Sequence, residues 1–276
     1  MKRYTSNIIV FIAFVLYAQA TLGSITQNTG GFVAHTIDSK YLKEQRKVFV
    51  KLPQGYQASG TVKYPVIYIL GSRKLTRKTI QETDSMYRAH QMPKVIIVGI
   101  PHKSAQTRKR DLTPDFLKQN LKIEQAPLGQ ASQFLRFLEK EVITLINAQY
   151  ATSTSRLLVG HSREGLCVMY ILMRQSTLFT GYLALSPALW RENNLFVTKF
   201  EAFLQSTSSL SPFLFMSMGT REVTKMTQAF DKFVTLLHKY PHKEFTWSSS
   251  YTPNATHQTN HLHSVSQGIL LFFKYQ

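Results

Sequence analysis

The fold is decided by the stretch Leu157-Leu158-Val159-Gly160-His161-Ser162-Arg163-Glu164-Gly165, an apolar run, a turn and the start of a helical pattern. A serine on such a sharp strand-to-helix turn exposes its hydroxyl at a sheet edge, and the next backbone N–H faces a developing oxyanion. The usual pattern is Gly-x-Ser-x-Gly, but here Glu164 takes the last position and the glycine follows at Gly165. The stretch predicts a nucleophile at Ser162 with an oxyanion donor at Arg163; an ordinary strand–turn–helix connection is the alternative.

Similar apolar runs lie on both sides of this stretch and alternate with segments of helical period. Continuous apolar runs are typical of strands buried on both faces. They predict strands at 48–50, 64–70, 95–100, 157–159, 182–185 and 213–216, and the periodic segments predict helices at 134–146, 166–173, 230–237 and 269–273. This alternation predicts an α/β fold with a mostly parallel sheet flanked by helices on both faces.

A serine nucleophile needs a general base, and the loops beyond the carboxyl ends of the strands are where it is expected. In a fold of this kind the chain order is serine, then acid, then histidine. His257, His261 and His263 are the candidate bases. A metal site formed by the same three histidines is the alternative, although no carboxylate or cysteine lies beside them.

The composition describes a folded, basic protein. The 276 residues include 33 Lys and Arg against 15 Asp and Glu, a net charge of +18, and 43% are hydrophobic, which excludes a disordered or collagen-like chain. The single cysteine, Cys167, excludes an intramolecular disulfide and a cysteine-based zinc cage, and we expect it to be a small buried apolar residue.

The first twenty residues have the pattern of a secretory signal peptide. Lys2 and Arg3 precede the apolar run 8–17, and Ala18-Gln19-Ala20 supplies small residues at a cleavage site. The run is shorter than the ~20 residues of a spanning helix, so we expect no stable membrane span after cleavage. We therefore expect an exported protein, periplasmic or secreted, with residues 21–276 as a single domain of net charge +16 and no nucleic acid as partner.

Longer segments of the chain resemble a known family, the putative esterases of the α/β-hydrolase fold typified by human esterase D and the bacterial ferric-enterochelin esterases. The resemblance covers nearly all of the chain after the signal peptide. It is carried, in order, by 64–70, 98–101, 110–114, 134–138, 160–162 and 185–190.

The resemblance implies a serine esterase without a cofactor. By the spacing to the last helix in the family, His257 is its base, and Glu222, in the loop after the strand at 213–216, is its acid; an ion pair of Glu222 with Arg221 or Lys225 is the alternative. We expect ester hydrolysis through Ser162, His257 and Glu222.

The chain departs from the family pattern at two positions of the site. Gly71-Ser72 stands where the family has Asp-Gly, and Glu164 stands where it has Gly. The resemblance places the second oxyanion donor at the backbone N–H of Ser72 or Arg73. A protein with a weakened or inactive site, which binds a ligand without turnover, is the alternative function, and activity restored by Glu164→Gly is its test.

The charge distribution bears on the substrate. Residues 73–122 contain twelve Lys and Arg against four acids, and much of this segment follows strands whose carboxyl ends share an edge with Ser162. We expect a basic rim that attracts an anionic small-molecule ester, such as a siderophore ester, with Arg73 and Trp190 as substrate-binding residues. The alternatives are a solvated basic surface that never meets substrate, plain packing for Trp190, and a polyanion-binding surface protein; the oligomeric state is left open.

Overall fold

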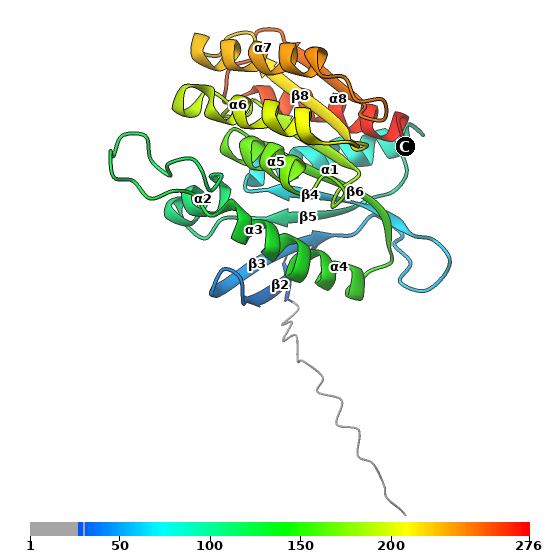
Figure 1. Cartoon of the computed structure of the whole chain (residues 1–276). Coiled ribbons are helices and arrows are strands. Elements are labelled where there is room, and N and C mark those ends of the chain that lie inside the picture. Colours follow the sequence, from blue (N-terminus) through cyan, green and yellow to red (C-terminus); the bar gives the residue numbers. More distant parts are fainter. Residues whose placement is uncertain (1–26, 30) are drawn as a thin grey trace, which may run out of the picture.

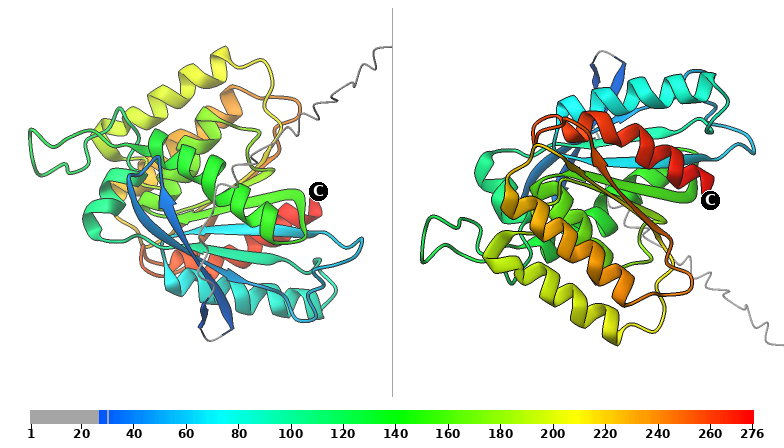
Figure 2. Two further views of the ribbon diagram at one scale, coloured as in Figure 1. Left: turned by 90° about the horizontal axis from the view of Figure 1, so that it is seen from below. Right: turned by 90° about the horizontal axis from the view of Figure 1, so that it is seen from above.

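The computed structural model describes residues 27–29 and 31–276, in which a nine-stranded sheet lies between two layers of helices (Figures 1 and 2). The predicted signal peptide, residues 1–20, lies outside the described residues.

None of the helices in the described part of the chain has the length and apolar character needed to cross a membrane.

The sheet has the order β1-β2-β3-β5-β4-β6-β7-β8-β9. The six strands from β5 to β9 in this order all pair in parallel, whereas β1, β2 and β3 form an antiparallel extension along the side of β5. The strand bounds are β1 Gln27–Thr29, β2 Phe32–Ser39, β3 Glu44–Lys51, β4 Tyr64–Leu70, β5 Ile96–Ile100, β6 Thr152–His161, β7 Gly181–Leu185, β8 Phe213–Gly219 and β9 Trp247–Thr252.

The helices cover both faces of this sheet, each above its own hydrophobic core. Helices α1 and α8 pack side by side on one face, where their apolar residues meet Ile67, Ile69 and Leu183, and the remaining helices lie on the other face (Figure 2). The helix bounds are α1 Arg73–Arg88, α2 Ala105–Leu112, α3 Ala131–Phe137, the π-helix η1 Leu138–Ile143, α4 Thr144–Gln149, α5 Arg163–Arg174, α6 Arg191–Ser206, α7 Thr224–Lys239 and α8 Asn260–Lys274.

These elements form the mostly parallel, helix-covered sheet of an α/β-hydrolase fold, as the sequence predicts. All six predicted strands are present. The predicted helix at 134–146 consists of α3, η1 and α4, with one π-helical stretch in the middle. The last helix was predicted at 269–273, which is wrong at its start, because α8 already begins at Asn260 with a polar first turn.

The parallel strands end at one edge of the sheet and thereby position the site. The residues that follow β4, β6, β7 and β8 are Gly71, Ser162, Ser186 and the turn that contains Glu222. In open parallel sheets this carboxyl edge is where ligands bind.

Candidate active site

Ser162 lies on a strained turn between β6 and α5. Its backbone has φ 62° and ψ −115°, a conformation that a residue with a side chain rarely adopts. The turn is held from several directions: the Ser162 N–H donates to the carbonyl of Leu185 at 2.9 Å, and the Ser162 carbonyl accepts from the N–H groups of Leu166 and Ala188. Ser162 therefore stands fixed at the start of α5.

The structure brings the three predicted residues, Ser162, His257 and Glu222, into one line of hydrogen bonds. Nε2 of His257 lies 2.9 Å from Oγ of Ser162, and Nδ1 of His257 lies 2.8 Å from Oε2 of Glu222. In the neutral tautomer that suits both contacts, Nδ1–H donates to the carboxylate and Nε2 accepts from the serine hydroxyl. The three come from the ends of β6 and β8 and from the loop before α8.

Glu222 is held by contacts that the sequence did not predict. Its Oε1 accepts from Oγ of Ser186 at 2.5 Å and from the N–H of Gly219 at 2.9 Å, while Asn260 donates from Nδ2 to Oγ of Ser186 at 2.8 Å. Burial alone would raise the pKa of Glu222, but the hydrogen bonds from His257, Ser186 and Gly219 outweigh it and hold this pKa below its usual range. Glu222 is thus kept ionised beside the imidazole.

Of the other two candidate bases, His261 packs against His161 and has no hydrogen bond to Ser162 among the described contacts. His261 lies in the first turn of α8, is buried, and stacks on the ring of His161 with the ring centroids 4.1 Å apart. Burial is the main cause that lowers the pKa of His161 to about 3 and of His261 to about 4. His161 donates from Nε2 to the carbonyl of His257 at 2.8 Å, so this neutral pair supports the His257 loop. His263 is exposed on α8.

Two backbone N–H groups beside the serine turn belong to the first residues of helices and have no partner within the helix. Arg163 is the first residue of α5 and Arg73 the first of α1, and the first N–H groups of a helix have no carbonyl to bind within it. Ser72 differs, since its N–H donates to the carbonyl of Leu70 at 3.1 Å and its Oγ caps α1 by accepting from the N–H of Leu75 at 3.2 Å. Of the two predicted donors in this turn, Arg73 is the one left free.

Glu164 fits into the turn because Gly71 leaves room for it. The carboxylate is buried, accepts from Nε and Nη2 of Arg108 at 2.7 and 2.5 Å, and lies 2.9 Å from Nε2 of His102. A Cβ on Gly71 would lie only 2.6 Å from Oε1 of Glu164. Burial would raise the pKa of Glu164, but the hydrogen bonds from His102 and Arg108 lower it to about 2. The two departures from the family pattern therefore touch each other.

The two predicted substrate-binding residues, Trp190 and Arg73, line separate hollows. Trp190 precedes α6, where Nζ of Lys225 lies 4.0 Å from the centroid of its ring, and it lines a hollow together with Leu121. Arg73 begins α1 and lines a separate cavity beside Gly71. Neither side chain has a hydrogen bond to Ser162 in the described structure.

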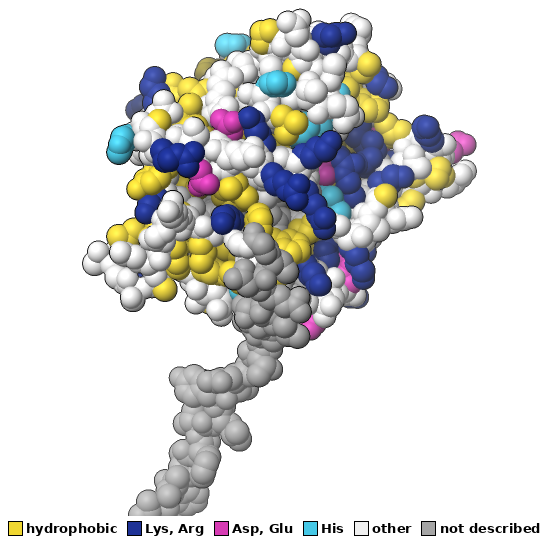
Figure 3. Space-filling model, turned by 180° about the vertical axis from the view of Figure 1, so that it is seen from behind, with side chains coloured by type: hydrophobic (Ala, Val, Ile, Leu, Met, Phe, Trp, Pro, Cys, Tyr) yellow, Lys and Arg dark blue, Asp and Glu magenta, His cyan; other side chains and the backbone are white. Residues whose placement is uncertain are grey.

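The basic residues of 73–122 are divided between the site and other places. Figure 3 shows Lys and Arg side chains gathered on one face of the molecule, most densely toward one side of it. Arg108 and Arg110 are bound to the carboxylates of Glu164 and Asp111, whereas Arg88 lines a hollow at the far end of α1. The expected basic rim is therefore smaller than the count of twelve suggests.

Two further expectations concern Cys167 and the alternative of a metal site. Cys167 is fully buried in α5, as predicted, and burial raises the pKa of its thiol. Among the described residues, no group of three or more His, Cys, Asp or Glu side chains is arranged to hold a metal ion.

A strained serine after a parallel strand, in line with a histidine and a carboxylate, is the arrangement of the serine hydrolases with the α/β-hydrolase fold. The profile of the family described as "Putative esterase" matches residues 39–233. The chain belongs to this family.

Several known proteins are similar to this chain. The crystal structure of an IroE-like serine hydrolase from Shewanella oneidensis superposes with a TM-score of 0.79 at 30% identity, covering 88% of this chain and 80% of that one. The siderophore triacetylfusarinine C esterase of Aspergillus fumigatus is 29% identical over 46% of this chain and 45% of its own length. The ferri-bacillibactin esterase BesA of Bacillus subtilis is 28% identical over 52% and 54%. The chain spans about half the length of these two curated relatives.

Proposed function

We propose that the protein is a serine-dependent carboxylic ester hydrolase in which Ser162, His257 and Glu222 are the catalytic residues. The observation that carries the proposal is the line of contacts from Oγ of Ser162 through His257 to Glu222, at 2.9 and 2.8 Å. Both distances lie within the ~2.6–3.2 Å that proton transfer between such groups requires.

In the first half of the reaction, Oγ of Ser162 attacks the ester carbonyl carbon while Nε2 of His257 takes the hydroxyl proton. The carbonyl π electrons move to the oxygen, which becomes the oxyanion. When the intermediate collapses, the bond to the alcohol oxygen breaks and His257 gives its proton to that oxygen. The alcohol leaves, and the acyl group stays on Ser162.

In the second half, water attacks the acyl group on Ser162 and His257 accepts a proton from it. Collapse of this second intermediate returns the proton to Oγ of Ser162 and releases the carboxylic acid. Glu222 remains ionised throughout, orients the imidazole through Nδ1 and stabilises its charged form, a role that its lowered pKa supports.

The oxyanion is held by the backbone N–H groups of Arg163 and Arg73 in this proposal. Each is the first residue of a helix, so each N–H is free and lies at the positive end of a helix dipole. Removal of one such donor costs about 3–4 kcal/mol of transition-state stabilisation in known enzymes. The position of the turn at Gly71 therefore matters for the rate.

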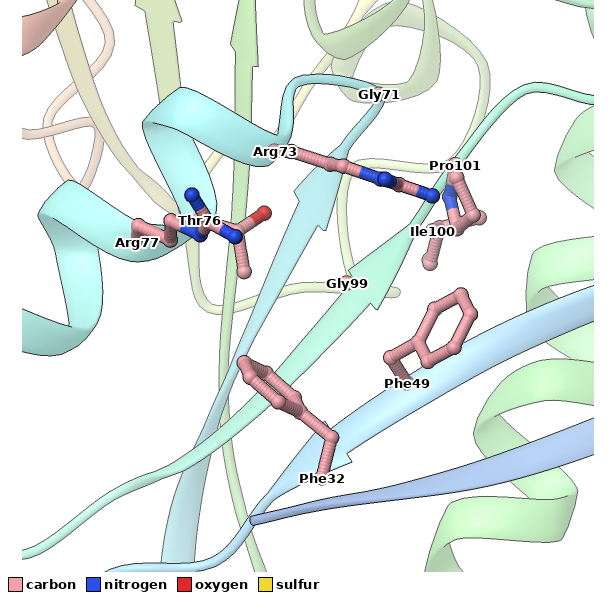
Figure 4. Close-up of a pocket in the computed structure, with 9 residues that line it drawn as sticks. All are labelled: Phe32, Phe49, Gly71, Arg73, Thr76, Arg77, Gly99, Ile100 and Pro101. Atoms are coloured by element: carbon pink, nitrogen blue, oxygen red, sulfur yellow. The ribbon is translucent and has the colours of Figure 1, made fainter. Parts of the chain in front are cut away.

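We further propose that the substrate is an anionic ester of the siderophore type and that the protein is exported. The names of the curated relatives, two siderophore esterases, support the substrate class. The guanidinium groups of Arg73 and Arg77, which have no ion pair among the described residues, would attract such an anion (Figure 4). Export rests on the signal-like pattern of residues 1–20.

A fluorophosphonate probe tests the proposal directly. We expect wild-type protein to be labelled at Ser162 and to hydrolyse simple esters, and Ser162→Ala to lose both properties while keeping its unfolding temperature. His257→Ala should lose labelling as well, because the hydroxyl would have no base. Folded wild-type protein that resists labelling at neutral pH would contradict the proposal and favour ligand binding without turnover.

A further inference from the structure

A buried group of polar side chains contacts Glu222 at its Oε1 atom. Because solvent does not reach this group, its hydroxyl and amide protons are used for hydrogen bonds within it. Its members come from the end of β7, from β8 and from α8, and each residue is at most 2% exposed: Ser186, Ser217, Asn260 and Ser264.

The short contact between Ser186 and Glu222 fixes the direction of the hydroxyl proton. Oγ of Ser186 lies 2.5 Å from Oε1 of Glu222 and 2.8 Å from Nδ2 of Asn260. A contact of this length between a hydroxyl and an ionised carboxylate needs the hydroxyl proton between the two oxygens. Ser186 has only this one proton, so toward Asn260 it can only accept. The amide nitrogen of Asn260, and not its oxygen, must therefore face Ser186.

Two other contacts of Asn260 require the same orientation of its amide. Oγ1 of Thr252 lies 2.5 Å from Oδ1 of Asn260, and only the hydroxyl can supply the proton between them. Ser264 donates from Oγ to the backbone carbonyl of Asn260 at 2.9 Å, which leaves Ser217 to donate to Oγ of Ser264 at 2.7 Å. Ser217 then accepts from Nδ2 of Asn260 at 2.9 Å. Both amide protons are thus used, one by Ser186 and one by Ser217.

The backbone of Ser186 is strained in a way that fixes the direction of its side chain. Its φ is +46°, in the left-handed region that a residue with a side chain rarely adopts, and its N–H donates to the carbonyl of Ser217 at 2.7 Å. Strain of this kind persists only where the surrounding contacts determine the conformation, and it is concentrated at functional sites. Ser162 has a positive φ as well, so the nucleophile and the residue that contacts Glu222 are both held in this manner.

We propose that Asn260 and Ser186 are positioning residues of the esterase: Asn260 donates to Oγ of Ser186 and thereby directs the hydroxyl proton of Ser186 toward Glu222. The proposal rests on the proposed function, because Glu222 is the carboxylate of its triad. Ser186 and the N–H of Gly219 both donate to Oε1, so Oε2 remains for Nδ1 of His257 at 2.8 Å. The carboxylate is thus kept as an acceptor that faces the imidazole.

The titration of Glu222 reports whether this arrangement is intact. Burial raises its pKa, whereas its three hydrogen-bond donors lower it, and its only ion pair among the described residues is with His257. The other titratable groups that its charge affects are Tyr251 of β9 and His261 of α8. When Ser186 no longer donates, the pKa of Glu222 rises. The imidazole then loses its ionised partner at a higher pH as the solution is acidified.

Asn260→Asp tests the direction of the proton, because aspartate has the shape of asparagine but no amide protons. Its carboxylate would accept from Ser186 and draw the hydroxyl proton away from Glu222. For 4-nitrophenyl acetate we expect kcat to fall at least tenfold, KM to change less than twofold, and the acidic limb of kcat/KM to move to higher pH. A wild-type kcat and pH profile in folded Asn260→Asp protein would overturn the proposal.

Ser186→Ala and Ser217→Ala are a matched pair, since each removes a hydroxyl that accepts from Asn260 while only Ser186 contacts Glu222. Both should lower the unfolding temperature, because each leaves one amide proton without an acceptor. Only Ser186→Ala should lower kcat, threefold to tenfold, and shift the acidic limb; Ser217→Ala should keep kcat within twofold of wild type. If Asn260→Asp fails to fold, this pair decides, and equal losses of kcat in both variants would refute the proposal.

A second substitution shows whether Asn260 acts through Ser186. Asn260→Ala alone should lower kcat threefold to tenfold, because Oγ of Ser186 loses its donor and the hydroxyl can turn. In Ser186→Ala protein the same substitution should cause less than a twofold further loss. Additive losses would contradict the proposed route.

Fluorophosphonate labelling separates a failure of this inference from a failure of the proposed function. Wild-type protein that is not labelled at Ser162 would refute the esterase. Labelled wild-type protein whose acidic limb coincides with those of Ser186→Ala and Asn260→Asp would refute the positioning role alone.

Discussion

At the scale of single residues, the pair Gly71 and Glu164 decides whether the site is intact. The family resemblance implies an Asp at position 71 and a Gly at position 164, whereas this chain has Gly71 and Glu164. Because a Cβ on Gly71 would lie 2.6 Å from Oε1 of Glu164, one of the two positions must be small when the other carries a carboxylate. His102 and Arg108 bind the carboxylate that is present. The exchange is consistent with an active site.

A double-mutant cycle tests this exchange. We expect Gly71→Asp to lower both kcat and the unfolding temperature, because φ at residue 71 is +80° and two carboxylates would collide. Glu164→Gly alone should destabilise the protein by about 1–3 kcal/mol, since it leaves His102 and Arg108 without their acceptor. The double variant should recover most of the lost activity, with a coupling free energy of about 1 kcal/mol or more.

The control for this cycle is Glu201→Gln, which removes an exposed ion pair with Lys239 and should leave the unfolding temperature nearly unchanged. Additive effects of Gly71→Asp and Glu164→Gly would contradict the exchange. An increase of activity in Glu164→Gly alone would also contradict the exchange, because that is the result expected if Glu164 weakens the site.

At the scale of elements, α8 is placed by one close approach to the sheet. A Cβ on Gly268 would lie 2.5 Å from Cδ1 of Phe215 and 2.8 Å from Cδ2 of Leu183, and both of these side chains are fully buried. The close contact lets α8 lie flat on β7 and β8. Its first turn then places Asn260 where its Nδ2 donates to Oγ of Ser186, which in turn donates to Oε1 of Glu222.

We therefore expect Gly268→Ala to destabilise the protein, contrary to helix propensity. Alanine in a helix interior is favoured over glycine by about 1 kcal/mol, but overpacking a rigid core costs about 1–3 kcal/mol, and the second effect wins here. Thermal unfolding should show a lower midpoint, and kcat should fall because Asn260 moves. Gln267→Ala, exposed on the same helix, is the matched control; a midpoint of Gly268→Ala at or above the wild-type value would contradict the packing argument.

The elements that the sequence predicted are those with a clear apolar pattern. Strands buried on both faces, such as β4 and β7, appear in the sequence as continuous apolar runs. The edge strand β9 does not, because half of Trp247–Thr252 is serine and the strand is partly exposed, and α1 does not because Lys and Arg fill its exposed face. Both were missed for that reason.

The residues of the candidate site also differ in whether the sequence could predict them. Ser162, Glu222 and His257 could be named because a motif, a chain order and a family resemblance point to them, and they do lie together. Ser186 and Asn260 could not, since 74 residues separate these two partners and neither belongs to a motif. Contacts of this kind depend on the packed sheet and not on local spacing.

At the scale of the whole molecule, we expect the excess of positive charge to affect the rate of ester hydrolysis more than the stability of the fold. Arg73 and Arg77, which have no ion pair in the part of the chain that the structure describes, lie on the first part of α1, whereas Arg88 lies at its other end. Charges more than a Debye length apart are screened. The electrostatic field beside the serine turn is therefore set by few residues.

We expect kcat/KM for an anionic ester to fall severalfold as ionic strength rises from about 0.01 to 1 M, because screening removes the attraction. The value for a neutral acetyl ester should change less than twofold over the same range. Steady-state kinetics of both esters in parallel provide the measurement and its control. If the two esters respond alike, the charge does not guide substrate to this site.

The single cysteine has a practical consequence for work on this molecule. Cys167 lies in the interior of α5, directly behind the serine turn, and solvent does not reach it in the folded chain. A thiol reagent can modify it only when α5 opens away from the sheet. The wild-type protein thus contains a natural reporter for local unfolding of α5. The rate of thiol modification measures how often α5, which begins directly after Ser162, separates from the sheet.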